Sequence, residues 1–139
     1  MEEKNTWCFA CGKNNPIGLK LKFREEDDTY STTFTAQKEH QGYDGIVHGG
    51  IVSVLLDEVM AGYIYAKGAN AVTARLEVRY HEPTPILEEL TVSAQVLNHK
   101  NNIYELKGEV KLPDGRITAS GKAKVAIIGA DDNNAPPIP

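Results

Sequence analysis

Hydrophobic and polar residues alternate along much of the chain, which is the pattern of half-buried β-strands. A first strand is predicted where Leu19, Leu21 and Phe23 alternate with basic residues, and a second where threonines and aromatics cluster. Between the early and late strands, the spacing changes to the i, i+3, i+4, i+7 repeat of an amphipathic helix. The predicted order is strands at 19–24 and 29–35, a helix at 51–67, and strands at 72–80, 90–96, 104–112 and 117–128.

Turn signals separate these elements and define one domain. Gly68 is well placed to end the helix, and Pro83 and Pro85 end the strand that follows it. Pro113-Asp114-Gly115 is a hairpin turn signal, because proline presets φ and glycine accepts a positive φ. Further turns are expected at 25–28 and 98–102, and a glycine-rich loop at 37–50. We therefore expect a single α+β domain over 1–129, with a turn-rich segment at 1–18 and a flexible tail at 130–139.

Composition narrows the class of protein. The chain has 139 residues, one domain by the usual length prior, and a net charge of −4, which argues against a nucleic-acid binder. The opening residues lack the apolar core of a signal peptide, and no run of about 18 apolar residues is present. We expect a cytoplasmic protein that binds neither nucleic acid nor membrane.

A glycine-rich loop that enters the predicted helix is the first candidate site. The first backbone N–H groups of a helix have no intrahelical partners, and the positive end of the helix dipole lies behind them. An anion, or an oxygen that becomes an oxyanion, is stabilised there. Gly49 and Gly50 leave room for a substrate to approach the backbone, and His48 could polarise a carbonyl. The alternative is a tight loop-to-helix entry without a ligand.

Two carboxylates interrupt the apolar helix. At about 100° per residue, Asp57 lies at the margin of the apolar face, and Glu58 lies farther round on the more solvent-facing side. A carboxylate at the edge of a buried face is costly without partners, and its raised pKa would suit general-base catalysis. Thr73, on the next strand, could hold a water molecule with an inward hydroxyl. The alternative is that both carboxylates are solvated surface charges.

Cys8 and Cys11 form a CxxC pair without a second pair elsewhere. Structural zinc needs four ligands, so a site here would require histidines brought in by the fold. A redox pair is a second reading, and a packed turn is the third and the one we expect. Two cysteines do not imply a disulfide framework. We therefore expect no metal and no cofactor.

The residues His48-Gly49-Gly50, followed by Asp57, resemble the HGG-x6-D stretch of hotdog-fold acyl-CoA thioesterases of the phenylacetyl-CoA and hydroxybenzoyl-CoA type. Residues 71–83 resemble the strand that follows the helix in that family, and residues 8–19 resemble the start of one subgroup. The resemblance covers roughly residues 17–128. It implies a hotdog fold, in which one long central helix is wrapped by a five- to six-stranded antiparallel sheet.

The resemblance also implies roles for these residues. The N–H groups near Gly49 and Gly50 would form an oxyanion hole, with His48 shaping the loop. Asp57, reaching across from a partner subunit, would act as general base or nucleophile, and Thr73 matches a position that holds the attacking water in some members. Many members carry an amide side chain six positions before the HGG histidine. Here that position is Gly42, so either the adjacent Gln41 substitutes or the donor is missing.

By this resemblance the chain hydrolyses the thioester of a small or medium acyl- or aryl-CoA, which is its substrate and not a cofactor. It would work as a homodimer, and as a dimer of dimers. Met60 and Tyr63 are candidates to line the acyl pocket, with Gly49 and Gln41 also near the substrate. Two alternatives stay open: a non-catalytic acyl-CoA binding module on the same fold, and hydration of an enoyl thioester by His48 with Glu58.

Overall fold

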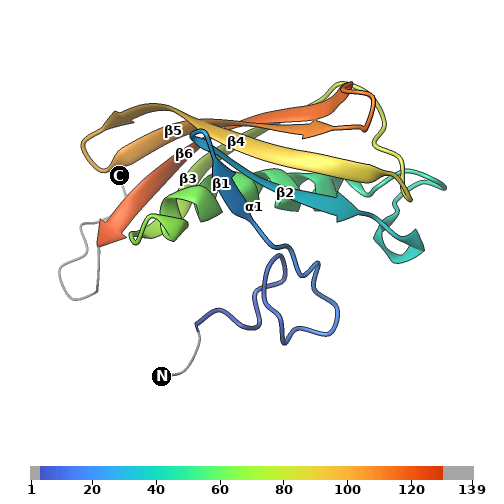
Figure 1. The fold of residues 1–139 in the computed structure, drawn as a ribbon, viewed down its shortest axis with the longest axis horizontal. Coiled ribbons are helices and arrows are strands. Elements are labelled where there is room, and N and C mark those ends of the chain that lie inside the picture. Colours follow the sequence, from blue (N-terminus) through green and yellow to red (C-terminus); the bar gives the residue numbers. More distant parts are fainter. Residues whose placement is uncertain (1–3, 130–139) are drawn as a thin grey trace.

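The computed structural model describes residues 4–129 and shows one long helix covered on one side by an antiparallel sheet (Figure 1). The sheet has six strands in the order β1-β2-β4-β5-β6-β3, so β1 and β3 form its two edges. The predicted α+β class and the predicted order of elements are confirmed. The elements are β1 (Arg24–Glu26), β2 (Thr29–Thr35), a 3₁₀ turn η1 (Lys38–His40), α1 (Gly49–Ala66), β3 (Asn70–Tyr80), β4 (Glu89–Lys100), β5 (Ile103–Lys111) and β6 (Ile117–Gly129).

Helix α1 supplies one side of the hydrophobic core. It begins at Gly49, two residues before the predicted start, and Gly68 follows its end with φ of +98°. Its length and mean hydropathy of 1.3 would suit a membrane span, but core helices share these features and this one packs against the sheet. Its buried residues are the ones that the periodicity predicts, together with one isoleucine: Val52, Leu55, Leu56, Val59, Met60, Tyr63 and Ile64.

The first predicted strand is largely wrong. Leu19 and Leu21 are buried as their alternation predicts, but Lys20 between them has φ of +57°, which an extended strand does not allow. The Leu19 and Leu21 N–H groups donate to the carbonyls of Phe9 and Ala10, so the N-terminal segment takes the hydrogen bonds that a strand would use. Strand β1 is therefore only three residues long.

The hairpin turns follow from residues that accept a positive φ. Asp27 and Asp28, with φ of +52° and +59°, connect β1 to β2 as a two-residue loop. Gly115, with φ of +92°, turns the chain between β5 and β6. The turn predicted at 98–102 is shorter than expected, because β4 runs to Lys100 and leaves only Asn101 and Asn102 in the turn.

A β-bulge in β3 changes which way its side chains face. Thr73 pairs with Val125 and Arg75 pairs with Lys124, so Ala74 is the extra residue. Strict alternation would place Thr73 on the outer face with Arg75. Instead Thr73 shares the inner face with its buried partner Val125 and lies against α1. The bulge thus aims a polar side chain at the helix.

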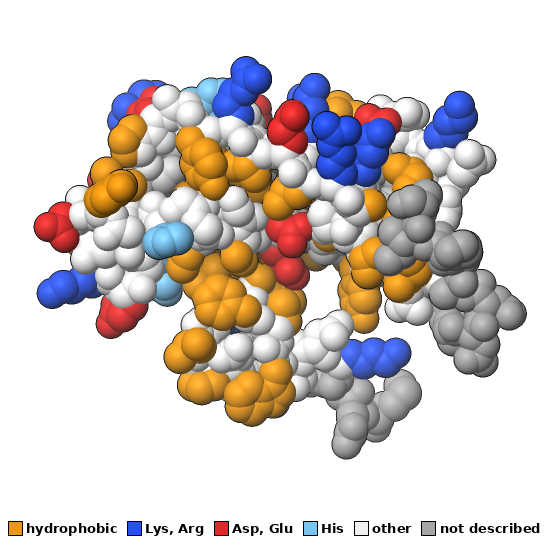
Figure 2. Space-filling view, turned by 180° about the vertical axis from the view of Figure 1, so that it is seen from behind, with side chains coloured by type: hydrophobic (Ala, Val, Ile, Leu, Met, Phe, Trp, Pro, Cys, Tyr) orange, Lys and Arg blue, Asp and Glu red, His pale blue; other side chains and the backbone are white. Residues whose placement is uncertain are grey.

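The N-terminal segment, residues 4–23, lies on the side of α1 that the sheet leaves uncovered (Figure 1). Ala10 is buried in the core, whereas Trp7, Phe9 and Ile17 are exposed. Hydrophobic side chains accordingly gather on the surface of this segment (Figure 2). The domain boundary at 129 and the predicted tail at 130–139 lie at or outside the limit of the described residues.

Candidate active site

His48 caps the start of α1 and is fixed by its own helix. Its Nδ1 accepts a hydrogen bond of 2.9 Å from the Gly50 N–H. Because Nδ1 is the acceptor, the neutral imidazole carries its proton on Nε2. The side chain is exposed, so this N–H is available to an incoming oxygen. The Gly50 N–H itself is occupied, which leaves Gly49 and the His48 ring as the donors at the helix start.

Tyr80, at the end of β3, holds the first turn of α1. Its hydroxyl donates to the Gly49 carbonyl at 2.8 Å, and it lies 2.8 Å from the Ser53 hydroxyl. Since the Tyr80 proton goes to Gly49, Ser53 is the donor in the second contact. Tyr80 is half exposed beside the glycines. Nothing in the sequence distinguishes Tyr80, because a tyrosine at the end of an alternating strand is common.

A cavity of about 690 Å³ lies in front of the helix start. Gly42 lies against His48, since a β-carbon there would be 3.3 Å from the His48 Cα. The Gln41 side chain turns inward on the loop, where its Oε1 accepts a hydrogen bond of 2.8 Å from the Gly45 N–H. The lining combines apolar, aromatic and polar groups: Gly42, Tyr43, Ile46, Val47, His48, Gly49, Val52, Tyr80, His81, Glu82, Pro83 and Thr84.

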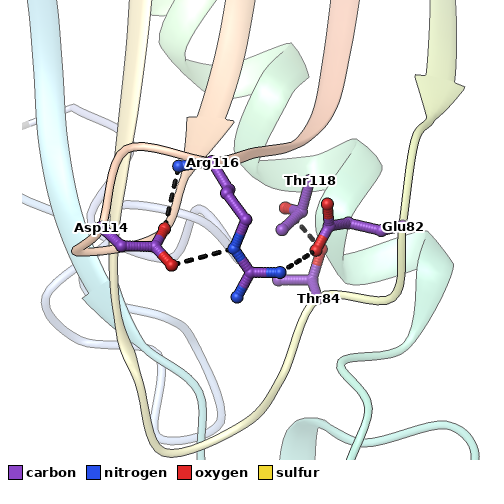
Figure 3. A network of polar contacts seen from close by, with 5 residues as sticks. All are labelled: Glu82, Thr84, Asp114, Arg116 and Thr118. Atoms are coloured by element: carbon purple, nitrogen blue, oxygen red, sulfur yellow. Dashed lines mark hydrogen bonds and ion pairs between the residues drawn. The ribbon is translucent and has the colours of Figure 1, made fainter.

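One wall of this cavity is tied to the β5–β6 turn (Figure 3). Arg116 donates to Glu82 at 2.7 Å and to Asp114 at 2.9 Å. Below this exposed ion pair, the buried Thr84 hydroxyl donates to the Thr118 hydroxyl at 2.8 Å. The Thr84 carbonyl accepts from the Val47 N–H, so the network reaches the loop that carries His48.

Asp57 and Thr73 form a second polar site, between α1 and the edge strand β3. The Thr73 hydroxyl donates to Asp57 Oδ1 at 2.6 Å, and both side chains are partly buried. The hydroxyl therefore fixes one carboxylate oxygen and leaves the other for a further partner. The bulge at Ala74 makes this pair possible, because it turns Thr73 toward the helix.

The two polar sites do not meet within one chain. Gly50 and Asp57 are both in α1, seven positions apart. At 1.5 Å per residue they are about 10 Å apart along the helix axis. A thioester held at the Gly49 end is therefore out of reach of Asp57 of the same chain.

Met60 and Tyr63, the predicted pocket residues, lie in the core. Met60 is fully buried and packs against the backbone of β5 and β6 at Gly108 and Gly121. Tyr63 is 2% exposed and its hydroxyl donates to Glu25 at 2.6 Å. Contact of either side chain with an acyl group would require the core to open.

Glu58 does not face solvent, contrary to the expectation from helical periodicity. It is partly buried beneath the N-terminal segment, where it meets Cys8 and Cys11. Burial is the main cause that raises the pKa of Glu58, and burial and then the Glu58 charge raise the pKa of Cys11. Periodicity could not reveal this, because it does not show what covers the side of a helix opposite the sheet.

Comparison with known proteins agrees with this architecture. The model of the thioesterase superfamily matches residues 44–119, which is more than half of the chain. Acyl-coenzyme A thioesterase 13 of Homo sapiens is 26% identical over 89 residues, covering 62% of this chain and 64% of the relative. The chain spans less than two thirds of the length of the curated relatives that it matches.

Two solved structures have the same fold. The thioesterase superfamily protein RHA08564 superposes with a TM-score of 0.81 at 27% identity, over 87% of this chain and 60% of that one. The protein smu.793 of Streptococcus mutans UA159, solved with acetyl-CoA, superposes with a TM-score of 0.72 at 16% identity, over 78% and 89% of the two chains.

A single long helix wrapped by a six-stranded antiparallel sheet, with a glycine-led helix start at one end, defines a hotdog-fold protein. The matched segment includes both Gly49 and Asp57. The chain belongs to the thioesterase superfamily.

Proposed function

We propose that this protein is an acyl-CoA thioesterase whose active sites form between two copies of the chain. The observation that carries the proposal is the pair of incomplete polar sites on α1. The helix start offers donors to a carbonyl oxygen, and the Asp57–Thr73 pair offers a base, but one chain keeps them about 10 Å apart. A second copy placed in the opposite direction would bring its Asp57 to the first copy's Gly49.

The free edge of the sheet supports such a pairing. Strand β3 bonds to β6 on one side only, and its 11 residues form the far edge of the sheet. An unpaired edge of this length is a template for another strand. Because Thr73 is in β3, pairing two such edges would place both Asp57–Thr73 pairs at the interface between the copies. We propose a homodimer as the minimal active unit, and a dimer of dimers as its assembly.

The proposed reaction follows from the donors at the helix start of one copy and the Asp57–Thr73 pair of the other. The thioester carbonyl oxygen accepts from the Gly49 N–H and the His48 Nε2–H, which stabilise the negative charge that develops on it. Asp57 of the other copy takes a proton from a water molecule held by its free oxygen and by Thr73, and the resulting hydroxide adds to the carbonyl carbon. The C–S bond then breaks, and the CoA thiolate takes up the proton that Asp57 removed from the water, which regenerates the base. The products are a carboxylic acid and free CoA.

The cavity in front of His48 indicates the substrate class. It holds about 690 Å³ in the single chain and is bordered by Val52, Tyr43 and Tyr80. Small or medium acyl and aryl groups fit such an apolar and aromatic lining. The relatives named as acyl-coenzyme A thioesterases and the neighbour solved with acetyl-CoA support a CoA thioester as substrate.

The deciding experiment measures free-thiol release from short, medium, branched and aryl acyl-CoAs by the wild type and Asp57→Asn. The wild type should release CoA, and the variant should lose about 10²- to 10⁴-fold in rate, because an amide cannot act as the base. Glu89→Gln, an exposed change at the start of β4, is the matched control and should keep full activity. Binding of acyl-CoA without thiol release would favour a non-catalytic module instead, and the missing side chain at Gly42 would be the reason to examine first.

A further inference from the structure

The turn formed by Cys8 and Cys11 lies directly against the core helix. The Cys8 N–H donates to the Asn5 carbonyl, and the Gly12 N–H donates to the Cys8 carbonyl at 2.8 Å. Gly12 is needed for this turn, because a β-carbon there would overlap the Cys8 backbone nitrogen and lie 2.5 Å from the Thr6 carbonyl oxygen. The backbone thus folds tightly enough to point both sulfurs at α1.

The carboxylate of Glu58 lies beside the two thiols. The sulfurs of Cys8 and Cys11 and a carboxylate oxygen of Glu58 all lie within 4.8 Å of one another. Neither cysteine is in a disulfide. Within residues 4–129, the salt bridges join Lys111 to Glu109 and Arg116 to Glu82 and Asp114, and none involves Glu58. Three groups that become anions on deprotonation therefore converge from two separate parts of the chain.

We propose that Cys8, Cys11 and Glu58 bind a zinc ion that joins the N-terminal segment to helix α1. Thiolates at 2.3 Å and a carboxylate at 2.0–2.2 Å are standard zinc ligands. Ligands of a tetrahedral ion at those distances are about 3.5–3.8 Å apart, so small side-chain rotations suffice to close the group around the ion. In the sequence only the two cysteines stand out as ligands, with histidines as the expected partners, whereas the fold supplies Glu58.

The fourth position of the ion faces a cavity of about 450 Å³. Cys8, Cys11 and Glu58 line it, together with Tyr30 and Tyr65. Its space suits a water molecule as the fourth ligand. This cavity is separate from the one in front of His48, which shares none of these residues.

A carboxylate ligand distinguishes this proposal from a redox pair. A CxxC disulfide needs no third group, and closing one would take away the thiol that Glu58 contacts. Burying a carboxylate without a partner is unfavourable. Zinc instead satisfies all three groups at once, and it would fix the N-terminal segment to α1.

The test is metal analysis of protein purified without chelators and dialysed against metal-free buffer. We expect about one zinc per chain in the wild type and in Glu89→Gln, the matched control. The Cys8→Ser/Cys11→Ser double variant should lose the zinc, and Glu58→Gln should release it to a competing chelator at least about tenfold more readily, because an amide is a weaker zinc ligand.

Cobalt replacement tests the proposed zinc site in the wild type, so the test still holds if a variant does not fold. Co²⁺ added to the metal-free protein should give the thiolate charge-transfer and visible bands of a tetrahedral site, and Glu58→Gln should shift them. Wild-type protein that binds neither ion while both thiols remain reduced would overturn the proposal. So would zinc that persists in the double variant, or a Cys8–Cys11 disulfide in protein isolated under mild reducing conditions.

Discussion

At the scale of single residues, the orientation of a few polar side chains determines what the proposed site can do. The His48 Nδ1 accepts a hydrogen bond from the Gly50 N–H. The ring proton of the neutral imidazole is therefore on Nε2, which points outward. Tyr80 fixes the Gly49 carbonyl from the other side. These contacts leave the helix start rigid before any substrate arrives, and preorganised donors of this kind lower the barrier of acyl transfer.

Tyr63 gives a residue-level prediction for alkaline pH. Burial, and then its hydrogen bond to Glu25, raise the pKa of Tyr63 from 10.0 to about 12. Since the folded state holds this proton more tightly, the stabilisation is complete below about pH 10 and is lost as the pH rises through about 12. Urea unfolding should therefore show falling stability over this range in the wild type.

Tyr63→Phe separates this effect from the titration of other groups. The variant should be less stable by about 1 kcal/mol at pH 8, because it lacks the hydrogen bond to Glu25. The difference from the wild type should shrink between pH 10 and pH 12, since phenylalanine does not titrate. A difference that stays constant over this range would contradict the raised pKa.

At the scale of elements, the threonine pair beneath the Arg116 network connects the wall of the cavity to the β5–β6 turn. Thr118→Val should cost about 1–3 kcal/mol of unfolding free energy, because it leaves the buried Thr84 hydroxyl without its acceptor. Thr33→Val, an exposed change on β2, should alter stability by less than about 0.5 kcal/mol. Equal effects in chemical denaturation would show that the Thr84 contact does not stabilise the wall.

Elements with a regular hydrophobic period were predictable from the sequence, and those fixed by long-range hydrogen bonds were not. The periodicity located α1 and the late strands because burial alternates along them. It misplaced the first strand, since the N–H groups of Leu19 and Leu21 bond to a segment ten residues earlier. It also could not reveal the bulge at Ala74, which depends on pairing with β6.

Some residues of the candidate site could likewise be predicted from the sequence, and others could not. His48, Gly49 and Asp57 stand out because glycines lead into a helix and a carboxylate interrupts its apolar face. Glu58 was expected to face solvent, but the turn formed by Cys8 and Cys11 covers that side of the helix. The role of Tyr80 could be recognised only from the structure, because the fold brings the end of β3 beside the start of α1.

At the scale of the whole molecule, the proposed dimer predicts complementation between two inactive variants. Asp57→Asn and His48→Ala should each be nearly inactive alone. Mixed and refolded together in equal amounts, they should recover about a quarter of wild-type activity, because half of the symmetric dimers are mixed and one of their two sites is intact. Asp57→Asn mixed with Asp57→Ala is the control and should recover none.

Mass measurement in solution accompanies that experiment. Light scattering should give at least two copies per particle for the wild type and for both variants. A monomer that hydrolyses acyl-CoA, or a dimer without complementation, would place the complete site within one chain and contradict the proposed arrangement.

The position of β3 in the sheet affects how the chain folds during its synthesis on the ribosome. Among the described strands, β3 pairs with β6 alone, and β6 begins at Ile117, well after β3 ends at Tyr80. At about 5–20 residues per second, the ribosome needs several seconds to synthesise the intervening segment. During that time the apolar face of α1 and an unpaired strand are exposed together, so the nascent chain is most vulnerable to aggregation and most dependent on chaperones before its last strand emerges.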